Sequence, residues 1–394
     1  MPEIASLRTP AVLIDRAKAI RNLDRMQAAA KARGIRLRPH SKTHKSPLIA
    51  RWQIERGASG ICCAKLGEAE VFANAGIADI RLPYPLNPSN ADRVVAISNR
   101  THLSFIVDHP AVAKQWSEAL IRRAKRIDVL VKIDVGFHRC GIDADSRDTL
   151  GMIKGVAALP GLRLTGLLSH AGQAYHAQSE DELRTMAEAE ARTMSDLAER
   201  CRKNGVPIEE VSAGATPPAR FSIQQKGFTE FRPGNYVYFD RTQVALGAAT
   251  FDDCALTVLA TVVSKPAPDR IIFDSGSKTL TNDGARGFTP APGHGVVLRV
   301  APGSPLRTSG GEVQTGNEFL SGNLKLDNDL LIERLSEEHA TVRVLSGSTD
   351  LEPGDRVRII PNHSCVVSNL VDQAWLVDGD VVEALPILAR GKIT

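Results

Sequence analysis

The chain has 394 residues, enough for two domains with substantial cores. Its 49 basic and 45 acidic residues give a net charge of +4 and are scattered, which argues against a nucleic-acid partner and suits a small anionic ligand. No window approaches the ~20 apolar residues of a membrane helix, and the first ten residues lack the apolar core of a signal peptide. With six irregularly spaced cysteines, these features predict a cytoplasmic protein with no membrane partner.

From residue 35 to about residue 245, short apolar runs alternate with amphipathic helical stretches. We expect strands near residue 35 and at 60–64, 79–83, 103–107, 127–134, 162–169, 210–213 and 230–238. Helical patterns lie between them, for example at 67–75 and 179–204. Eight strands, each followed by a helix, predict a (β/α)8 TIM barrel of the α/β class at 20–245.

The sequence texture changes after residue 245, where helical periodicity thins and β-rich runs appear. We expect strands at 256–263, 270–274, 295–300, 340–345, 356–360, 374–377 and 381–386. Turns rich in Gly, Pro, Asp and Asn separate these runs. Residues 246–394 are therefore predicted to form a second, mostly β domain.

The first barrel strand leads into residues 38–47, which read Arg-Pro-His-Ser-Lys-Thr-His-Lys-Ser-Pro. Ser46 and Pro47 suit the start of a helix, so Lys42 is expected just past the carboxyl end of the strand, where barrels keep their chemistry. Four basic residues surround it in sequence: Arg38, His40, His44 and Lys45. We expect them to favour the uncharged amine of Lys42, which attacks carbonyl groups. A solvated basic turn is the alternative interpretation.

Two small-residue turns follow the seventh and eighth predicted strands, at residues 212–218 (Ser-Ala-Gly-Ala-Thr-Pro-Pro) and 232–236 (Arg-Pro-Gly-Asn-Tyr). Such turns expose successive backbone N–H groups, and the hydroxyl of Thr216 adds a donor. The loops after the last two strands of a barrel commonly hold phosphates. Singly these are ordinary loops, but together they predict a phosphate site.

Polar side chains also follow the fifth and sixth predicted strands. Residues 134–141 read Asp-Val-Gly-Phe-His-Arg-Cys-Gly, and residues 169–175 read Ser-His-Ala-Gly-Gln-Ala-Tyr. Because strand ends meet at one mouth of a barrel, Arg139, His170 and Tyr175 become candidate site residues beside Lys42. A surface arginine in a glycine turn is the alternative interpretation of Arg139.

A candidate metal site follows the predicted strand at 356–360, where residues 361–365 read Pro-Asn-His-Ser-Cys. If the segment is extended, His363 and Cys365 point the same way and can share one metal. A thiolate with an imidazole favours zinc over magnesium or manganese. Two protein ligands leave positions for a substrate oxygen, as in catalytic sites, although a His-x-Cys pair alone is a weak signal.

Two motifs together resemble a known family. The segment Arg-Pro-His-x-Lys-Thr-His-Lys at 38–45, preceded by Leu-x-Thr-Pro-Ala-x-Leu-x-Asp at 7–15, resembles the opening of the D-serine dehydratase and D-threonine aldolase family, and the resemblance continues to the C-terminus. These are pyridoxal-phosphate enzymes of fold type III, with the fold of alanine racemase. The resemblance implies that residues 1–19 join the β domain. It also implies a homodimer in which the β domain of one chain closes the barrel mouth of the other.

The resemblance further implies roles for individual residues. Lys42 would carry pyridoxal 5'-phosphate as a Schiff base, Arg139 would lie near the 3-oxygen of the ring, and the His-x-Cys pair would bind zinc, with Mn²⁺ or Mg²⁺ as alternatives. His170 would stack on the ring, and Tyr175 would reach the substrate. The remaining cofactor-binding residues would be His40, Gly214, Thr216, Gly234, Asn235 and Tyr236. The family often has Tyr and His where this chain has His170 and Gln173, and the aldolase branch typically has a carboxylate in place of Cys365.

These motifs predict a lyase acting on D-3-hydroxy amino acids, most simply D-serine or D-threo-3-hydroxyaspartate, with β-elimination to a 2-oxo acid and ammonia. Retro-aldol cleavage to glycine and an aldehyde is the alternative within the family. An amino-acid racemase would have no use for the metal pair. A non-catalytic barrel carrying pyridoxal phosphate would resemble the first domain only.

Overall fold

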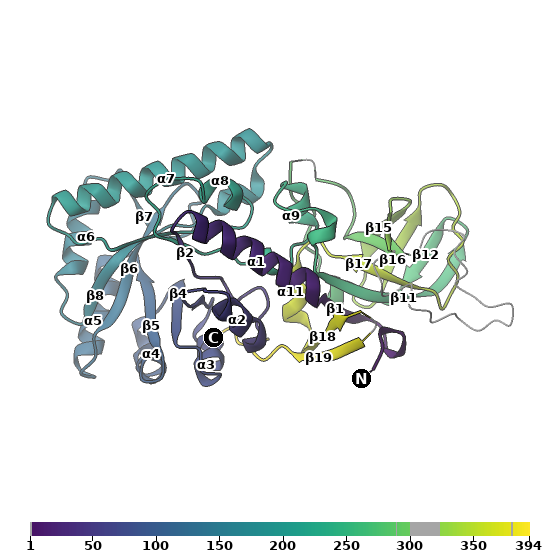
Figure 1. The fold of residues 1–394 in the computed structure, drawn as a ribbon, viewed down its shortest axis with the longest axis horizontal. Helices are drawn as coiled ribbons and strands as arrows, with labels where there is room; N and C mark the ends of the chain where they lie inside the picture. Colours follow the sequence, from purple (N-terminus) through teal and green to yellow (C-terminus); the bar gives the residue numbers. More distant parts are fainter. Residues whose placement is uncertain (1, 289, 300–323, 380) are drawn as a thin grey trace. The chain divides into compact units, whose positions relative to one another are not determined.

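The computed structural model describes residues 2–288, 290–299, 324–379 and 381–394 (Figure 1). The chain divides into two compact units. The first, here called the barrel unit, comprises Leu23–Tyr236 and Gly391–Thr394, and the second, the β unit, comprises Met1–Asn22 and Val237–Arg390.

The barrel unit is built on a parallel sheet with the strand order β2-β10-β9-β8-β6-β5-β4-β3. Its strands are β2 (Arg36–Leu37), β3 (Ile61–Cys62), β4 (Asp79–Pro85), β5 (His102–Val107), β6 (Ile127–Asp134), β8 (Leu162–Leu168), β9 (Glu210–Ala213) and β10 (Glu230–Phe231), with the short β7 (Ile142–Asp143) added to β6. Just past β2, Ser41 N donates to Cys62 O at 2.8 Å and Cys62 N donates to Pro39 O at 2.7 Å. These bonds join β2 and β3, which stand at the two ends of the strand order. The sheet is therefore closed, and the predicted barrel is confirmed.

Helices precede or follow the barrel strands in the chain, and those after the strands lie outside the sheet (Figure 1). They are α1 (Arg16–Ala32), which begins in the β unit, α2 (Pro47–Glu55), α3 (Leu66–Asn74), α4 (Ala91–Ser98), α5 (Pro110–Ile121), α6 (Thr149–Ala157), α7 (Glu180–Lys203) and α8 (Ala219–Ser222). In α7 the Ser179 side chain caps the first turn by accepting from Glu182 N at 3.1 Å. Its first turn is acidic and its last turn basic, as the helix dipole favours.

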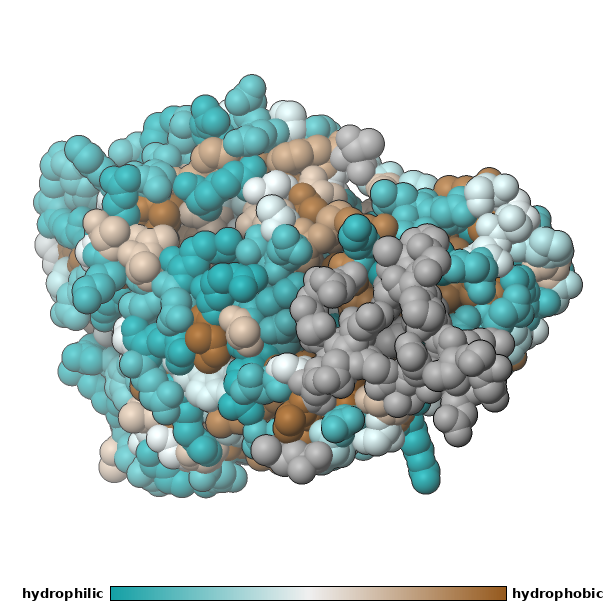
Figure 2. All heavy atoms as spheres, turned by 45° about the vertical axis from the view of Figure 1, so that its right-hand side comes forward, coloured by the Kyte–Doolittle hydropathy of each residue, from teal (hydrophilic) through white to brown (hydrophobic). Residues whose placement is uncertain are grey.

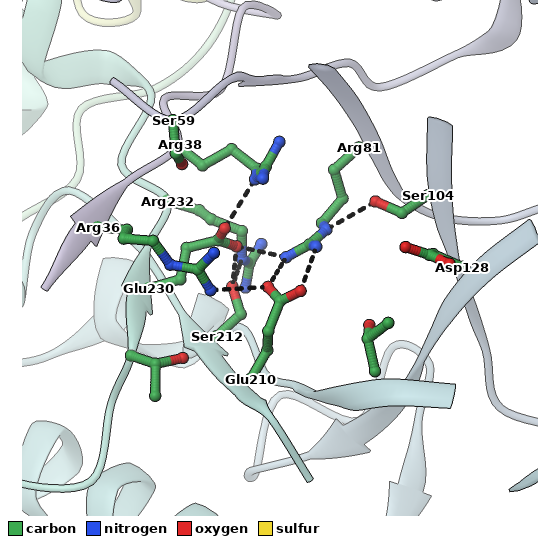
Figure 3. Close-up of polar contacts among 12 residues, drawn as sticks. Arg36, Arg38, Ser59, Arg81, Ser104, Asp128, Glu210, Ser212, Glu230 and Arg232 are labelled. Carbon is green, nitrogen blue, oxygen red and sulfur yellow. Dashed lines mark hydrogen bonds and ion pairs between the residues drawn. The ribbon is translucent and has the colours of Figure 1, made fainter. Parts of the chain in front are cut away.

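The barrel interior holds a network of ion pairs, shown in Figure 3. The carboxylate of Glu230, with no exposed side-chain surface, accepts from Arg38 Nε at 2.7 Å and from Arg81 Nη1 at 2.5 Å. Ser212 donates to the same carboxylate at 2.7 Å and accepts from Arg232 Nε at 2.7 Å. Barrels of this kind are usually filled by branched apolar side chains, so this interior depends on complete pairing of its charges.

One local prediction for the barrel unit was wrong. The strand expected at 230–238 ends after Phe231, because Pro233 and Gly234 interrupt it and the 3-10 helix Asn235–Val237 follows. The predicted start of α2 is confirmed, since Ser46 is its N-cap residue and Pro47 lies in its first turn, although the Ser46 side chain makes no cap bond. Instead its backbone N–H donates to His44 Nδ1 at 3.1 Å.

The β unit contains a sheet with the order β14-β13-β17-β11-β1-β18-β19, from which β12, β16 and β15 continue. Its strands are β1 (Ala11–Asp15), β11 (Leu256–Ala267), β12 (Arg270–Phe273), β13 (Val296–Arg299), β14 (Lys325–Asp327), β15 (Leu330–Leu335), β16 (Ala340–Val344), β17 (Arg356–Ile360), β18 (Gln373–Asp378) and β19 (Val381–Pro386). Strand β1 pairs antiparallel with β11 and parallel with β18. The short helices are α9 (Arg241–Ala245), α10 (Ser277–Leu280) and α11 (Ser364–Leu370).

Most predicted β-domain strands are present, and β14 and β15 are additional to them. Residue 300, the end of the strand expected at 295–300, lies outside the described residues. Part of the core of this unit is formed by Ile4, Leu13, Leu259 and Val382, each at most 1% exposed. The N-terminal segment therefore contributes apolar side chains to the same core as the C-terminal strands.

Hydrophobic side chains form small separate patches among hydrophilic ones on the face drawn in Figure 2. The large hydrophobic residues that are exposed are also dispersed in sequence, among them Ile121, Val263 and Leu345. No helix in the described part of the chain is long and apolar enough to cross a membrane.

Candidate active site

Lys42 lies in the turn after β2 and is exposed, whereas its neighbours Ser41, Thr43 and His44 are fully buried. Ser41 anchors the turn by donating from Oγ to Cys62 O at 2.8 Å. The burial of its neighbours fixes the backbone of this turn and leaves the Lys42 amine accessible at the carboxyl end of the strand. This is the position predicted from the sequence.

The surrounding cations do not crowd Lys42 in the way that we expected. Arg38 is paired with Glu230 and with Asp79, at 2.7 Å and 2.5 Å. Lys45 is paired with Glu68, whose side chain is 1% exposed. Both positive charges are therefore compensated by carboxylates that lie far from the turn in sequence.

The two histidines of the turn are electrically neutral. Burial, together with nearby Lys42 and Arg232, holds the pKa of His40 well below its usual range. Burial lowers the pKa of His44 to about 3, because hydrogen bonding to Gln53 and Ser46 offsets only part of the desolvation. The four basic residues therefore do not form a cluster of uncompensated positive charges around Lys42.

The turn after β9 has the properties of a phosphate cradle. The consecutive residues Gly214, Ala215 and Thr216 are buried, and their backbone N–H groups have no acceptor among the described residues. A Cβ on Gly214 would lie 2.7 Å from backbone atoms of Arg232, so this close approach requires glycine. Buried N–H groups without an acceptor are costly, and an anionic oxygen would satisfy them. This arrangement fits the phosphate of pyridoxal phosphate.

The turn after β10 packs against this cradle and against the Lys42 turn. Gly234 N donates to Thr216 Oγ1 at 3.3 Å, and a Cβ on Gly234 would lie 3.1 Å from Thr43 Oγ1. Asn235 and Tyr236 are buried, and the Tyr236 hydroxyl accepts from Gln53 Nε2 at 3.2 Å. Any contact of Tyr236 with a phosphate would therefore come from its backbone.

The segment after β6 is shaped by Asp134, whose Oδ1 accepts from three backbone N–H groups, of Gly136, Phe137 and His138, at 3.0–3.1 Å. The resulting turn presents Arg139, which is exposed and lies over the Phe137 ring at 5.0 Å. The Arg139 guanidinium is thus accessible at the barrel mouth, as a contact with the cofactor ring would require.

The segment after β8 brings His170 next to the cradle. His170 Nδ1 lies 2.6 Å from Gly214 O, and its ring meets that of Phe137 edge to face with centroids 6.1 Å apart. Burial and nearby Lys42 and Lys132 keep the pKa of His170 well below its usual range, so its ring is neutral. Tyr175 is half-buried on the 3-10 helix Gly172–His176. Phe137 therefore links the segments that carry Arg139 and His170.

Sequence analysis missed a buried polar group behind these residues. Lys132 on β6 is 4% exposed, and burial together with nearby Arg232 lowers its pKa to about 7. Glu190 on α7 accepts from Ser169 Oγ at 2.6 Å, and its pKa is raised by burial. Arg232 also donates to the Ser169 carbonyl. A lysine within the apolar run of β6 was the available signal for Lys132.

The candidate metal pair in the β unit differs from the predicted extended segment. His363 is extended, but helix α11 begins at Ser364, so Cys365 lies in its first turn. Asp240 accepts from Ser364 N at 2.9 Å and fixes this helix start. The alternation of side chains along a strand therefore does not apply to His363 and Cys365. Cys365 is nevertheless within hydrogen-bonding reach of the His363 ring. The correction concerns the local conformation and not the proximity of the two side chains.

The donor chemistry at His363 fits a metal with few protein ligands. His363 Nδ1 lies 2.5 Å from Asp283 Oδ2, which leaves Nε2 for a ligand. Burial lowers the pKa of His363, but Cys365, Asp240 and Asp283 outweigh burial and raise it to about 10, so a metal that binds Nε2 would displace a proton from it. Among the described residues, no group of three or more His, Cys, Asp or Glu side chains is arranged to hold a metal. His363 and Cys365 therefore offer one nitrogen and one sulfur.

The closed parallel barrel and the mostly β second unit match the alanine racemase-like fold that the sequence motifs imply. Two family models match the chain: alanine racemase, N-terminal domain, at residues 14–242, and a serine dehydratase domain at residues 255–377. The first covers more than half of the 394 residues. Together the two matches extend over both units.

Individual relatives match over nearly the whole chain. A D-threo-3-hydroxyaspartate dehydratase from Delftia sp. (strain HT23) is 33% identical, covering 96% of this chain and 97% of that protein. A D-threonine aldolase from Arthrobacter sp. is 32% identical, covering 98% and 94%. The cysteine-to-alanine variant of a D-threo-3-hydroxyaspartate dehydratase, solved in a metal-free form, superposes with a TM-score of 0.87 at 30% identity over 98% of this chain and 99% of that one. A histidine-to-alanine variant of the dehydratase has a TM-score of 0.86 at 30% identity, covering 98% and 96%.

The chain belongs to the family of D-serine dehydratases and D-threonine aldolases, which are pyridoxal-phosphate-dependent lyases. The resemblance found in the sequence motifs is thereby confirmed.

Proposed function

We propose that the protein is a metal-dependent dehydratase of D-3-hydroxy amino acids, acting on D-serine or 3-hydroxy-D-aspartate. The observation that carries the proposal is the pairing of a thiol, Cys365, with the His363 imidazole. The two variants of the related dehydratase replace a histidine and a cysteine that lie two positions apart, as His363 and Cys365 do, and the cysteine variant is described as metal-free. This parallel supports a metal at the same pair here.

Lys42 is the proposed attachment point of pyridoxal phosphate, because its amine is accessible beside the cradle. The backbone N–H groups of residues 214–216 would hold the phosphate together with Gly234 and Asn235, and Arg139 would contact the ring of the cofactor. His40 and His170 are neutral and add no charge around the ring. When bound, pyridoxal phosphate supplies an acceptor for the electrons released at the substrate α-carbon. Tyr175 is proposed to contact the substrate.

With pyridoxal phosphate bound, the amine of Lys42 would be the base that takes the α-proton of the substrate. Loss of hydroxide from the β-carbon completes the elimination of water, and the enamine product hydrolyses to a 2-oxo acid and ammonia. His363 and Cys365 are proposed to hold zinc, with Mn²⁺ or Mg²⁺ as alternatives. When bound, such an ion acts as a Lewis acid toward the β-hydroxyl group.

Retro-aldol cleavage to glycine and an aldehyde is the second candidate. The observation that favours it is the 32% identity to a D-threonine aldolase, close to the 33% identity to the dehydratase. Cys365 argues for the dehydratase. The aldolase branch typically has a carboxylate at this position, and carboxylate oxygens are harder ligands that suit manganese better than a thiolate does.

Assembly and location complete the proposal. A homodimer is expected because in this fold the β domain of one chain closes the barrel mouth of another, and a fully active monomer in light scattering would refute it. None of the six cysteines, all of which lie in the described part of the chain, forms a disulfide, and this supports a reducing, cytosolic location.

The test is a product assay on purified protein loaded with pyridoxal phosphate and zinc. D-Serine, D-threonine and their L-enantiomers are incubated separately, and 2-oxo acid, ammonia, glycine and aldehyde are measured. The proposal predicts 2-oxo acid and ammonia in equal amounts from D-serine and none from either L-enantiomer, whereas glycine and an aldehyde from D-threonine would favour the second candidate. Racemised substrate without 2-oxo acid or glycine would contradict it.

A further inference from the structure

The His363 imidazole is held by a carboxylate that the sequence did not single out. Its Nδ1 lies 2.5 Å from Oδ2 of Asp283, eighty positions earlier in the chain. The His363 and Asp283 side chains are 33% and 34% exposed, so the pair is partly shielded from water. A contact of this length between an imidazole N–H and a carboxylate is a charge-assisted hydrogen bond.

Asp283 is itself fixed by contacts that do not involve its carboxylate. Asn362, the residue before His363, donates from Nδ2 to Asp283 O at 3.0 Å and to Gly293 O at 3.0 Å. Asp283 N donates to the hydroxyl of Thr281 at 3.2 Å, and Thr281 has a φ of +66°, which is strained for a β-branched residue. The carboxylate is thus presented to the ring by a segment with a defined backbone.

The hydrogen bond at Nδ1 determines how the ring can bind a metal. A carboxylate that accepts from Nδ1–H fixes the tautomer with its lone pair on Nε2, and it makes Nε2 more electron-rich. Asp283 forms no third ligand with His363 and Cys365, since no such three-residue group occurs among the described residues. Asp283 contacts Nδ1 of the His363 ring and not Nε2, the nitrogen that would bind the metal.

We propose that Asp283 is a positioning residue of the His363–Cys365 metal site, which holds the imidazole so that Nε2 and the Cys365 sulfur bind one divalent ion. This inference rests on the proposed function, because it requires that the pair binds a metal. Asp283 contributes through His363 and does not itself touch the ion or the substrate.

The test measures metal affinity directly. Holoenzyme with pyridoxal phosphate is stripped of metal by a chelator and titrated with Zn²⁺ in competition with a chromogenic chelator. Asp283→Ala should weaken Zn²⁺ binding by about 10–100-fold, the effect usual for loss of such a partner. Asp283→Asn, whose amide oxygen can still accept from Nδ1–H, should recover part of this loss. Asp372→Asn, at an 86% exposed carboxylate, is the matched control and should bind Zn²⁺ as the wild type does.

Co²⁺ spectra separate an orienting role from direct ligation. The sulfur-to-cobalt charge-transfer band should persist unchanged in shape in Asp283→Ala once the site is saturated, because the ligands remain His363 and Cys365. A changed ligand-field pattern would make Asp283 a ligand and overturn the inference, as would unaltered Zn²⁺ affinity in both Asp283 variants. If His363→Ala and Cys365→Ala bind Zn²⁺ like the wild type, the proposed metal site itself fails, and the inference fails with it.

Discussion

Lys45 donates a hydrogen bond from Nζ to Glu68, and both side chains are buried. Three residues earlier in the same turn, Lys42 is exposed just past the carboxyl end of β2. A buried ammonium that neutralises a buried carboxylate is committed to stability, because removing either charge leaves the other without compensation. The two lysines of one turn therefore have different roles.

Lys42→Ala should abolish the visible absorbance of the lysine-bound cofactor while the protein stays folded, because an exposed side chain contributes little to stability. Lys45→Ala should retain the absorbance but lower the free energy of unfolding by about 3–5 kcal/mol, since Glu68 would lose its buried partner. Absorption spectra and chemical denaturation of both variants check these outcomes. Loss of the band in Lys45→Ala and not in Lys42→Ala would reverse the assignment.

Gly214→Ala should weaken binding of pyridoxal phosphate about tenfold or more. The added Cβ would meet backbone atoms of Arg232 at 2.7 Å, so the cradle would have to shift. Gly151→Ala is a suitable control, because nothing lies within 4 Å of its added Cβ and alanine favours a helix. Cofactor titration of the two apo variants gives the comparison, and equal affinities would show that residues 214–216 do not hold the phosphate.

Because Glu230 belongs to the ion network of Figure 3, the free energy of unfolding should fall as the pH is lowered into the acid range. Burial opposes its ionisation, but Arg81 and Arg38 outweigh burial and lower its pKa from 4.5 to about 2. A carboxyl group whose pKa is lower in the folded state stabilises the fold at any pH above its pKa in the unfolded state. This stabilisation is lost as the pH falls through its pKa in the folded state. Glu230→Gln should cost about 3 kcal/mol at pH 7, and this difference should shrink between pH 4.5 and 2. Urea titrations across that range check it, and a difference that is constant with pH would contradict the assignment.

The sequence supports the barrel because strand length and helix alternation are local patterns, and it supports the position of Lys42 because a strand end and Pro47 lie on either side. The charge states could not be predicted in the same way. Arg38 meets Glu230 across 192 positions, and Lys45 meets Glu68 in the first turn of α3 across 23 positions. Such partners are set by the closure of the barrel and leave no local signal.

The local conformation of the metal pair could not be predicted from the sequence for the same reason. The motif at 361–365 identifies His363 and Cys365 as candidates, yet their relative orientation depends on a short helix that starts at Ser364. That start is fixed by Asp240, which lies 124 positions away in the chain. A local pattern could indicate the ligands but not the conformation that brings them together.

Metal removal should affect catalysis more than folding. Chelation or Cys365→Ala should lower the rate by ~10²-fold or more, because a hydroxyl is a poor leaving group without a Lewis acid, while the cofactor absorbance and melting temperature stay nearly constant. Zinc should restore the chelated wild type but not Cys365→Ala. Cys365→Asp should shift the metal preference toward manganese. Full turnover in protein shown by elemental analysis to lack metal would remove the ion from the mechanism.

The most direct test of the central claim uses one substrate with two possible fates. From 3-hydroxy-D-aspartate, a dehydratase releases oxaloacetate and ammonia, whereas an aldolase releases glycine and glyoxylate. We predict that the zinc-loaded enzyme converts this substrate to oxaloacetate and ammonia in equal amounts, without accumulation of glycine. Stoichiometric glycine and glyoxylate without ammonia would contradict the assignment as a dehydratase.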